Sequence, residues 1–517
     1  MSPPPNVPVA EVRATAPAAL DAVVDGAAVD AGQGERLIRA TTSLCATCRR
    51  SVPAEVWRTG GAVVMRKLCD EHGFAEVALS PSAAWYERML AMAPALRAPK
   101  APRATAQGCP FDCGPCTSHE QEALLPIVPV TSACNLDCPI CYTHNRNAGA
   151  YHMSEAELRA ILGHIRQADP QRRLINLTGG EPTLHPDIVR LVELCAEEGI
   201  HRITLSTHGL RFLKDDDFLP RLAAAGARII LSFDSLDEDT NRKMLGGPLA
   251  AAKLEVLARL DRAGVPTTLL PVLARGHNDH EVGALVDLGL ATACVRSIEL
   301  HTMTFTGHGG LTFDRRGRYS TYEVLRDLET QTGGRLRVDD FVPSPAAHPL
   351  CYLVSYVLAM PDGGWLPLPR FLSTAELRAV LAGGLYLEPS PALEACLIDV
   401  ASRLWAGEVV LEAGLDPARV LAGLRALVDE AFAPGASIAA RMAAAERRIK
   451  AIYVHSHMDE DTFDTDRIRQ CCVGIREPDG RSIPSCAYNI LYRDRDARFS
   501  EAPAPALITL GRGRPTR

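Results

Sequence analysis

Between residues 125 and 302, short apolar runs alternate with amphipathic stretches. A short apolar run is typical of a strand buried on both faces, and the amphipathic stretch after it is typical of a covering helix. The expected strands are 125–131, 173–178, 202–207, 228–234, 266–272 and 296–302, with helices that begin near Ser154, Pro186, Asp215, Leu249 and Asn278. We therefore predict an α/β fold, a partial (β/α)6 barrel with its chemistry at the carboxyl ends of the strands.

The segments before and after this region have different patterns of apolar and polar residues. EVWRTGGAVVMRKL predicts two strands joined at Gly60 and Gly61, and a mainly helical stretch is expected over about 373–451. The expected domains are a disordered arm (1–40), a metal-binding hairpin domain (41–100), a cysteine-bearing loop (101–124), the barrel (125–340), a cysteine-bearing C-terminal region (341–493) and a disordered tail (494–517).

Bulk properties narrow the class of function. The chain has 517 residues, with 55 basic and 62 acidic side chains and a net charge of −7. No long block of one sign is present, which argues against a nucleic-acid surface and favours a small or apolar substrate. The first residues lack the pattern of a secretory signal, and no apolar run approaches the roughly eighteen residues that span a bilayer. We expect a cytoplasmic protein without a transmembrane segment.

Sixteen cysteines are present, and most lie in tightly spaced groups, which in a reducing compartment indicate metal sites. In VTSACNLDCPICY, an expected strand ends directly in Cys134, Cys138 and Cys141. Three thiolates on one loop can hold three irons of a [4Fe-4S] cluster and leave the fourth iron open. The alternative is a zinc knuckle that takes a distant fourth ligand.

The next expected strand ends in TGGEPT. Gly179 and Gly180 stand where the backbone could approach a ligand, and Glu181 could accept hydrogen bonds from an ammonium group. A lone GGE would be only a turn. Together with the cysteine triad one β/α unit earlier, it resembles the radical S-adenosylmethionine (SAM) superfamily over roughly residues 125–310.

The resemblance implies that SAM chelates the open iron and that the Gly179–Glu181 segment holds its amino end. It further implies that Tyr142 contacts adenine, and that Ser206, Thr207, Ser232 and Asp234 face the ribose and the carboxylate. Serine and threonine at strand ends are otherwise common turn formers. His208 departs from the family pattern, which has asparagine at this position.

A second triad with the same spacing, Cys109, Cys113 and Cys116, follows a linker and not a strand, so we assign it to an auxiliary cluster. Cys195, Cys294 and Cys396 lie singly in apolar contexts and are expected in the core. The remaining candidates for auxiliary ligands are Cys351, Cys471, Cys472 and Cys486. With the triad they complete one four-thiolate cluster and fall one short of two. Either one cysteine is spare, or His348, His455 or His457 completes a second cluster; each histidine alone could instead be structural or bind substrate.

Cys45, Cys48, Cys69 and His72 have the spacing of a tetrahedral mononuclear zinc or iron site on a hairpin. Such a closed site has no position for chemistry, so a structural role is expected. A small domain that cannot bury enough apolar surface gains its stability from such an ion. The alternative is a rubredoxin-like electron relay.

The order of these motifs over residues 41–493 resembles one radical SAM subgroup, which includes 7,8-dihydro-6-hydroxymethylpterin methyltransferase and tetraether lipid synthase. Ala346, Ala347 and the doubled Cys471–Cys472 depart from it. The resemblance implies one or two auxiliary clusters, a reductant such as a flavodoxin or ferredoxin, and a 5'-deoxyadenosyl radical that abstracts hydrogen. Methyl transfer or C–C bond formation on a small-molecule or lipid substrate would follow. The alternatives are radical modification of a peptide and a non-catalytic iron-sulfur scaffold.

Overall fold

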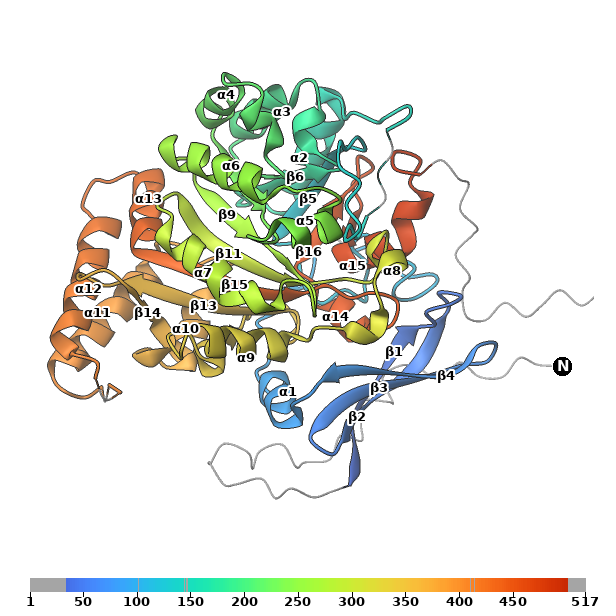
Figure 1. Cartoon of the computed structure of the whole chain (residues 1–517), viewed down its shortest axis with the longest axis horizontal. Helices are drawn as coiled ribbons and strands as arrows, with labels where there is room; N and C mark the ends of the chain where they lie inside the picture. Colours follow the sequence, from blue (N-terminus) through green and yellow to red (C-terminus); the bar gives the residue numbers. More distant parts are fainter. Residues whose placement is uncertain are drawn as a thin grey trace, which may run out of the picture.

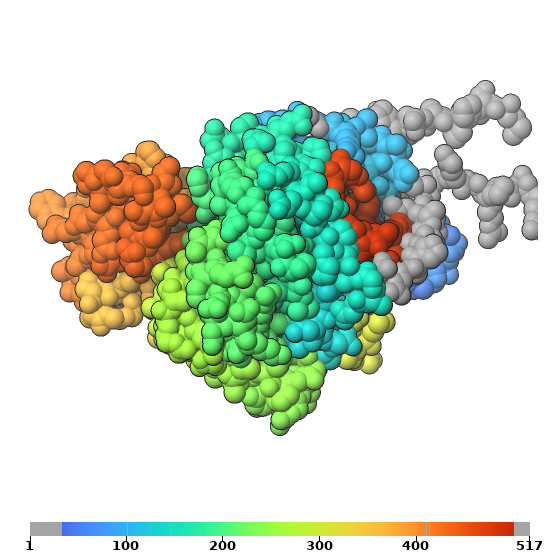
Figure 2. Space-filling model, turned by 90° about the horizontal axis from the view of Figure 1, so that it is seen from above, coloured from blue at the N-terminus to red at the C-terminus, as the bar shows by residue number. Residues whose placement is uncertain are grey.

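The computed structural model describes residues 34–100, 102–143, 145, 147–409, 411–412 and 414–500. A large mixed sheet occupies its centre, a four-stranded antiparallel sheet lies to one side, and a helical lobe lies beyond one end of the large sheet (Figure 1). The lobe, drawn in orange, protrudes from the body in the space-filling view (Figure 2). Within the described part of the chain, no helix combines the length and apolarity needed to cross a membrane.

The central region alternates strands and helices as the apolar pattern predicted. Its strands are β5 (Leu125–Thr131), β6 (Leu174–Gly179), β7 (Arg202–Thr207), β8 (Ala227–Ser232), β9 (Thr267–Leu270), β10 (Val272–Leu273) and β11 (Val295–Thr302). Its helices are α2 (Glu155–Ala168), α3 (Ile188–Glu197), α4 (Phe218–Ala224), α5 (Glu238–Leu245), α6 (Ala250–Arg262), α7 (Val282–Ala291), α8 (Gly309–Thr312) and α9 (Thr321–Gln331). The capping box is present: Glu157 N donates to Ser154 Oγ at 3.2 Å, and Ser154 N donates to Glu157 Oε2 at 2.8 Å.

The parallel strands lie side by side in the order β5–β6–β7–β8–β9–β11, and side chains such as Val128, Leu205 and Ile298 are fully buried on the strand face away from the cavity. The sheet has no pairing that joins its two end strands among the described residues, so it is an open partial barrel. The predicted fold class is confirmed, because parallel strands alternate with helices as the apolar pattern required.

Segments far along the chain extend this sheet at both ends. β15 (Ile449–Ser456) pairs in parallel with β11, and β16 (Val473–Arg476) pairs in parallel with β5. Antiparallel additions follow: β12 (Val342–Pro343), β13 (Tyr352–Ala359) and β14 (Trp365–Pro367) beyond β15, and β17 (Ser482–Pro484) beyond β16. The remaining helices are α10 (Thr374–Leu381), α11 (Pro391–Trp405), α12 (Pro417–Ala431), α13 (Ile438–Arg448), α14 (Thr465–Arg469) and α15 (Ser485–Ala487).

The hairpin domain (residues 35–90) is the blue sheet of Figure 1. It comprises β1 (Glu35–Leu44), β2 (Ser51–Thr59), β3 (Ala62–Cys69), β4 (Gly73–Ser80) and α1 (Ala83–Leu90). The two predicted strands are β2 and β3, joined at Gly60 and Gly61.

The boundaries of order differ from those expected at both ends. β1 begins at Glu35, inside the range expected to be a disordered arm, because it pairs along its length with β2. At the other end Phe499 is buried, and Arg498 pairs with Glu477 at 2.6 Å, so residues 494–500 pack onto the body. The rest of the expected arm and tail, 1–33 and 501–517, lies outside the described residues.

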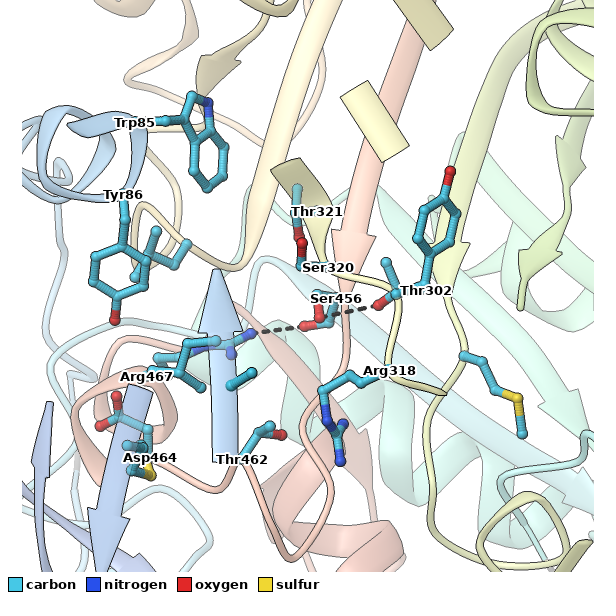
Figure 3. A pocket seen from close by; sticks show the side chains of 16 residues that line it. Trp85, Tyr86, Thr302, Arg318, Ser320, Thr321, Ser456, Thr462, Asp464 and Arg467 are labelled. Carbon is cyan, nitrogen blue, oxygen red and sulfur yellow. Dashed lines mark hydrogen bonds between the residues drawn. The ribbon is translucent and has the colours of Figure 1, made fainter. Parts of the chain in front are cut away.

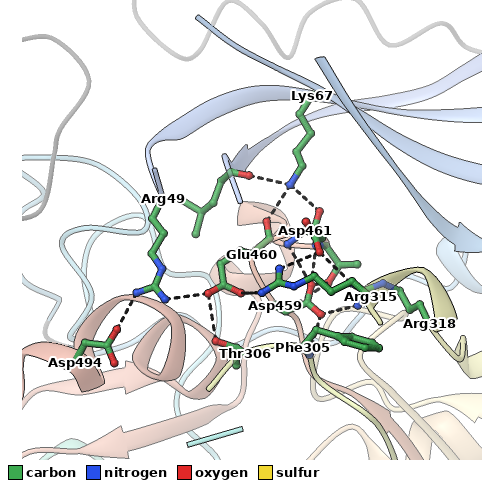
Figure 4. Close-up of polar contacts among 12 residues, drawn as sticks. Arg49, Lys67, Phe305, Thr306, Arg315, Arg318, Asp459, Glu460, Asp461 and Asp494 are labelled. Atoms are coloured by element: carbon green, nitrogen blue, oxygen red, sulfur yellow. Dashed lines mark hydrogen bonds and ion pairs between the residues drawn. The ribbon is translucent and has the colours of Figure 1, made fainter. Parts of the chain in front are cut away.

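Buried polar contacts join the hairpin domain to the segment between β15 and α14. Lys67 is nearly fully buried, and its Nζ donates to the carbonyl oxygens of Leu44, Glu460 and Asp461 at 2.7–2.9 Å (Figure 4). Arg49 pairs with Glu460 at 3.1 Å in the same view. Each group would lose its partner if the domain separated, which is costly for buried polar atoms. The hairpin domain is therefore a fixed part of the molecule.

A second such contact joins Arg39 on β1 to Asp464, whose carboxylate also accepts from Thr41 Oγ1 at 2.8 Å. Burial alone would raise the pKa of Asp464, but Arg39 and Thr41 lower it to about 2. The Asp464 side chain is 2% exposed. The pair is thus ionised and desolvated at neutral pH.

We predict that Asp464→Asn lowers the free energy of unfolding by about 3 kcal/mol, because it removes the buried counter-ion of Arg39 and leaves only Asp466, whose side chain is 38% exposed. An anaerobic urea titration followed by tryptophan fluorescence measures the change. Arg88→Ala is the matched control: Arg88 also pairs the hairpin domain with the body, through Asp339, but the two side chains are 51% and 79% exposed. Its effect is expected within about 0.5 kcal/mol. Equal losses from the two variants would contradict the assignment.

Candidate active site

One large cavity opens at the carboxyl ends of the parallel strands. It holds about 1740 Å³ between its lining atoms, counting its open mouth. Its lining includes every SAM-site residue singled out in the sequence: Cys134, Cys138, Cys141, Tyr142, Gly179, Gly180, Glu181, Ser206, Thr207, Ser232 and Asp234.

The three cysteines of this cavity lie on the loop that follows β5. Cys134 N donates to Asn147 Oδ1 at 2.9 Å, and Cys141 N donates to Cys138 O at 3.0 Å, which shapes the loop. Among the described residues, the groups of ligand atoms within 4.8 Å of one another do not include this triad. A single tetrahedral ion draws its sulfurs to about 3.8 Å apart, whereas a [4Fe-4S] cluster binds each thiolate at a different iron. The wider spacing fits a cluster better than a zinc knuckle.

Gly179 and Gly180 bring the end of β6 against the start of the cysteine loop. Gly180 N donates to Thr131 O at 2.9 Å, and Glu181 N donates to Ala133 O at 2.7 Å. A Cβ on Gly180 would lie 2.3 Å from Ala133 O, and one on Gly179, whose φ is +148°, would lie 2.2 Å from Thr131 O. Only glycine permits this approach. We call residues 179–181 the glycine shelf; it is fixed in contact with the cysteine loop.

Glu181 is 2% exposed and accepts four hydrogen bonds. Its Oε1 accepts from Thr183 N at 2.9 Å, Thr183 Oγ1 at 2.6 Å and Thr207 Oγ1 at 2.6 Å, and its Oε2 accepts from His208 N at 2.9 Å. A carboxylate offers about four lone-pair positions. Glu181 therefore ties the shelf to the end of β7, and an incoming ammonium would share oxygens that already accept hydrogen bonds.

His208 has a structural role in this site. Its Nε2 lies 2.7 Å from Asn135 Oδ1, and its Nδ1 accepts from Leu210 N at 3.1 Å. The imidazole thus links the turn after β7 to the residue beside Cys134. This contact accounts for a histidine at a position where the family pattern has asparagine.

A buried charged pair lies at the end of β8. Asp234 accepts from Ser232 Oγ at 3.1 Å and from Val272 N at 2.9 Å, and Lys253 Nζ donates to Ser232 O at 2.5 Å. Burial raises the pKa of Asp234 and lowers that of Lys253, and each charge opposes the shift of the other. Lys253 escaped the sequence analysis because a lysine on an amphipathic helix is usually solvated. Here it is 1% exposed and lines the cavity.

Two other residues predicted to contact SAM, Ser206 and Tyr142, interact with neighbouring side chains of the protein. Ser206 Oγ donates to Asn176 Oδ1 at 3.1 Å. The Tyr142 ring stacks on His457, with centroids 5.5 Å apart and planes at 19°. Tyr142 therefore connects the cysteine loop to a histidine that lies more than 300 residues later in the chain.

The hairpin domain holds a separate, compact group of ligands. Cys45, Cys48, Cys69 and His72 place one ligand atom each within 4.8 Å of one another. Cys48 Sγ lies 3.9 Å from Cys69 Sγ, and Cys69 Sγ lies 3.5 Å from His72 Nδ1. A tetrahedral zinc ion with about 2.3 Å to sulfur and about 2.0 Å to nitrogen gives separations of about 3.8 and 3.5 Å. These four residues fit one tetrahedral ion.

The auxiliary triad packs on the C-terminal segment. Cys113 N donates to Tyr492 Oη at 3.4 Å, and that hydroxyl donates to Pro110 O at 2.9 Å. Cys109 and Cys113 share an apolar cluster with Cys486. Burial raises the pKa of Cys109 to about 12, with a further rise from the neighbouring Cys116 thiol.

The other expected auxiliary ligands converge from three segments. Cys351, Cys471 and Cys472 pack together around Ala346 and Ala347. Arg467 Nε donates to Cys351 Sγ at 3.1 Å. Its Nη2 donates to Ser456 O at 2.7 Å (Figure 3). A buried guanidinium beside these thiols would offset the negative charge of thiolates bound to a cluster.

The three histidines considered as extra ligands lie in different surroundings. Cys486 Sγ lies 3.5 Å from His457 Nδ1, and His457 and His455 both line the cavity. Burial lowers the pKa of His457 to about 3 and that of His455 well below its ordinary value, so both rings are neutral. His348 is buried near Asp464 and Arg467, and burial lowers its pKa to about 3.

Residues 128–289 match the radical SAM superfamily, and residues 37–80 match the HMPTM N-terminal zinc ribbon domain. The chain is 28% identical over 489 residues to 7,8-dihydro-6-hydroxymethylpterin dimethyltransferase of Methanocaldococcus jannaschii, covering 89% of this chain and 95% of that protein. These matches confirm the resemblance drawn from the motifs.

Two other similar proteins match less than half of this chain. PqqA peptide cyclase of Methylorubrum populi is 29% identical over 248 residues, which cover 46% of this chain and 60% of the cyclase. A crystal structure of methylornithine synthase is 20% identical and superposes with a TM-score of 0.33, covering 41% of this chain and 64% of that one.

We predict that Gly180→Ala weakens SAM binding more than about tenfold, because its Cβ would displace the Ala133 carbonyl and with it the cysteine loop. Equilibrium dialysis with SAM on the anaerobically reconstituted protein measures this change. Gly163→Ala is the control, since a Cβ at this position of α2 meets nothing within 4 Å. It should leave binding unchanged and stabilise the helix slightly. Unaltered SAM affinity in the Gly180 variant would refute the role of the shelf.

We also predict that Cys48→Ser removes one zinc or iron ion per chain and exposes the hairpin domain to protease, because a three-ligand site holds a structural ion poorly. Elemental analysis and limited proteolysis provide the readouts. Cys396→Ser, in the helical lobe, should change neither. Full metal content in the Cys48 variant would contradict the site.

Proposed function

We propose that this chain, which carries a radical SAM domain behind an N-terminal zinc ribbon, is an enzyme that cleaves SAM reductively and uses the radical for methyl transfer to a small molecule. The observation that carries the proposal is the contact between the cysteine loop and the glycine shelf inside one cavity. Cys134, Cys138 and Cys141 would hold a [4Fe-4S] cluster. When bound, the cluster would supply the electron that cleaves SAM to methionine and a 5'-deoxyadenosyl radical, and this radical would abstract hydrogen from the substrate. Methionine keeps the methyl group of the cleaved SAM, so the transferred methyl group would come from a separate methyl donor, such as a second SAM molecule.

The protein's own residues would orient SAM at this site. The shelf backbone lies beside Cys134, so an amino acid end placed there is next to the cysteine loop. Lys253 provides a buried cation for a ligand carboxylate, and Asp234 with Ser232 provides acceptors for ribose hydroxyls. Residues of β5 to β9 line this half of the cavity.

The extent of similarity supports methyl transfer over peptide modification. Similarity to the pterin dimethyltransferase covers 89% of the chain and includes the hairpin domain and the cysteine-bearing C-terminal region. Similarity to the peptide cyclase covers 46%. Apart from the residues proposed to bind SAM, the cavity lining contains Glu299, His301, His455 and His457, and such polar groups suit a heteroatom-rich small molecule better than a lipid. C–C coupling on such a molecule is the second candidate.

We further propose that Cys109, Cys113, Cys116, Cys351, Cys471, Cys472 and Cys486 ligate one or two auxiliary iron-sulfur clusters. The packing of these cysteines supports the proposal. Cys486 packs in the same apolar cluster as Cys109 and Cys113. Burial raises the pKa of Cys486, and Cys351 is close enough for the charge of its thiolate to raise that pKa further. A flavodoxin or ferredoxin would supply the electrons.

We predict that Cys138→Ala reduces 5'-deoxyadenosine formation more than about 100-fold, because it removes a ligand from the cluster that cleaves SAM. The assay uses the full chain, reconstituted anaerobically with iron and sulfide and reduced with dithionite. Iron should fall by one cluster, and auxiliary and hairpin metals should remain. Cys396→Ala is the matched control and should retain activity. Activity that survives loss of Cys138 would exclude the proposed cluster.

A further inference from the structure

Three histidines form a second compact group of ligands in the described part of the chain. His301, His455 and His457 each place one ring nitrogen within 4.8 Å of the others. The ring centroids lie 5.0 Å apart for His301 and His455, 5.3 Å for His301 and His457, and 4.3 Å for His455 and His457. All three line the cavity that contains the cysteine loop.

The convergence follows from strand register. β11 and β15 are parallel neighbours, and their pairing places His301 directly beside His455. Side chains two residues apart on an extended segment point to the same side, so His457 follows His455 into the cavity. The group therefore rests on the rigid carboxyl ends of two central strands, which suits a site that must hold its geometry.

Two imidazole nitrogens of this group lack a hydrogen-bond partner among the described residues. These are His301 Nε2 and His455 Nδ1, which are both buried. His455 is 8% exposed. A buried polar atom without a partner is costly, and a cation shared by three imidazoles would satisfy them. Neutral imidazole is also the form that binds transition metals.

Neighbouring groups provide the support that a metal site requires. Glu299 Oε2 lies 3.5 Å from His301 Nε2, and the Glu299 carboxylate accepts from Tyr352 Oη at 3.4 Å. An anionic carboxylate this close to the ring nitrogens favours a cation bound among them. Tyr352 stacks on His455 with centroids 4.2 Å apart, and Tyr142 stacks on His457. The three rings are thus fixed from outside the group.

We infer that His301, His455 and His457 bind one divalent transition-metal ion, such as zinc, whose open position faces the cavity. Three histidines complete three of four tetrahedral positions, and the fourth is left for an exogenous ligand. In contrast to the hairpin site, this group is built like a site for chemistry or for substrate binding. Resting on the proposed function, the open position would take an oxygen or nitrogen donor of the small-molecule substrate and hold it near the cysteine loop.

Zinc binding to the full chain tests this inference. The protein is reconstituted anaerobically with iron and sulfide, titrated with Zn²⁺ alone, freed of excess and analysed by elemental analysis and zinc X-ray absorption. The Cys48→Ser background removes the hairpin site. We expect one zinc per chain in this background, with a nitrogen and oxygen shell at about 2.0–2.1 Å and no sulfur at about 2.3 Å.

Adding His455→Gln or His301→Gln to this background is expected to remove that zinc while iron and sulfide stay unchanged. His164→Gln is the matched control, because His164 Nδ1 is also buried without a partner but His164 belongs to no histidine group. Equal zinc in the Cys48→Ser protein with and without the histidine substitutions would overturn the inference, as would a sulfur shell or no zinc at all. If Cys48→Ser impairs folding, His301→Gln is made in the wild-type chain instead. Loss of one zinc equivalent per chain relative to the wild type then supports the inference, and an unchanged zinc content overturns it.

The two proposals fail separately. Absence of 5'-deoxyadenosine formation by the wild-type protein would refute the radical SAM function but leave the zinc measurement intact. Absence of zinc would leave SAM cleavage intact and would assign the three histidines to hydrogen bonding.

Discussion

The close contact between the glycine shelf and the loop after β5 is the constraint on which the site depends. Gly179 and Gly180 lie against backbone carbonyls with no room for a side chain. Glu181 fixes the shelf by accepting hydrogen bonds from Thr207 and His208 at the end of β7. This arrangement places three thiols, two glycines and a buried carboxylate at one sheet edge. The fold positions them because parallel strands all end at the same edge.

The ligand groups of the chain differ in spacing, and spacing indicates what each can hold. The hairpin ligands are as close as one tetrahedral ion requires, and they surround it fully. The cysteine triads are more widely spaced, as expected when each sulfur binds a different iron. The histidine group is compact but incomplete, with three ligands that face a cavity. The closed site suits stability, and the open sites suit chemistry.

The hairpin domain is part of the catalytic body through buried charge. Lys67, Arg39 and Arg49 reach the segment that follows β15, the same segment that leads from His455 and His457 to α14 and the cysteines beyond.

The sequence by itself determined the central fold and the first ligands. Apolar runs gave β5 to β11 nearly to the residue, because a strand covered by helices has no solvent face, and the capping box at Ser154 is a local interaction. The sequence predicted the triad that begins at Cys134 and the glycine shelf because the residues of each motif lie within a few positions of one another. Only the tertiary structure decided which distant segments meet them. The pairing of β15 with β11, and of β16 with β5, joins strands separated by more than 140 residues and lacks any local signal. The first pairing made His301 a neighbour of His455, and the packing of α6 against the end of β8 buried Lys253. A side chain's surroundings depend on such contacts, which sequence spacing does not encode.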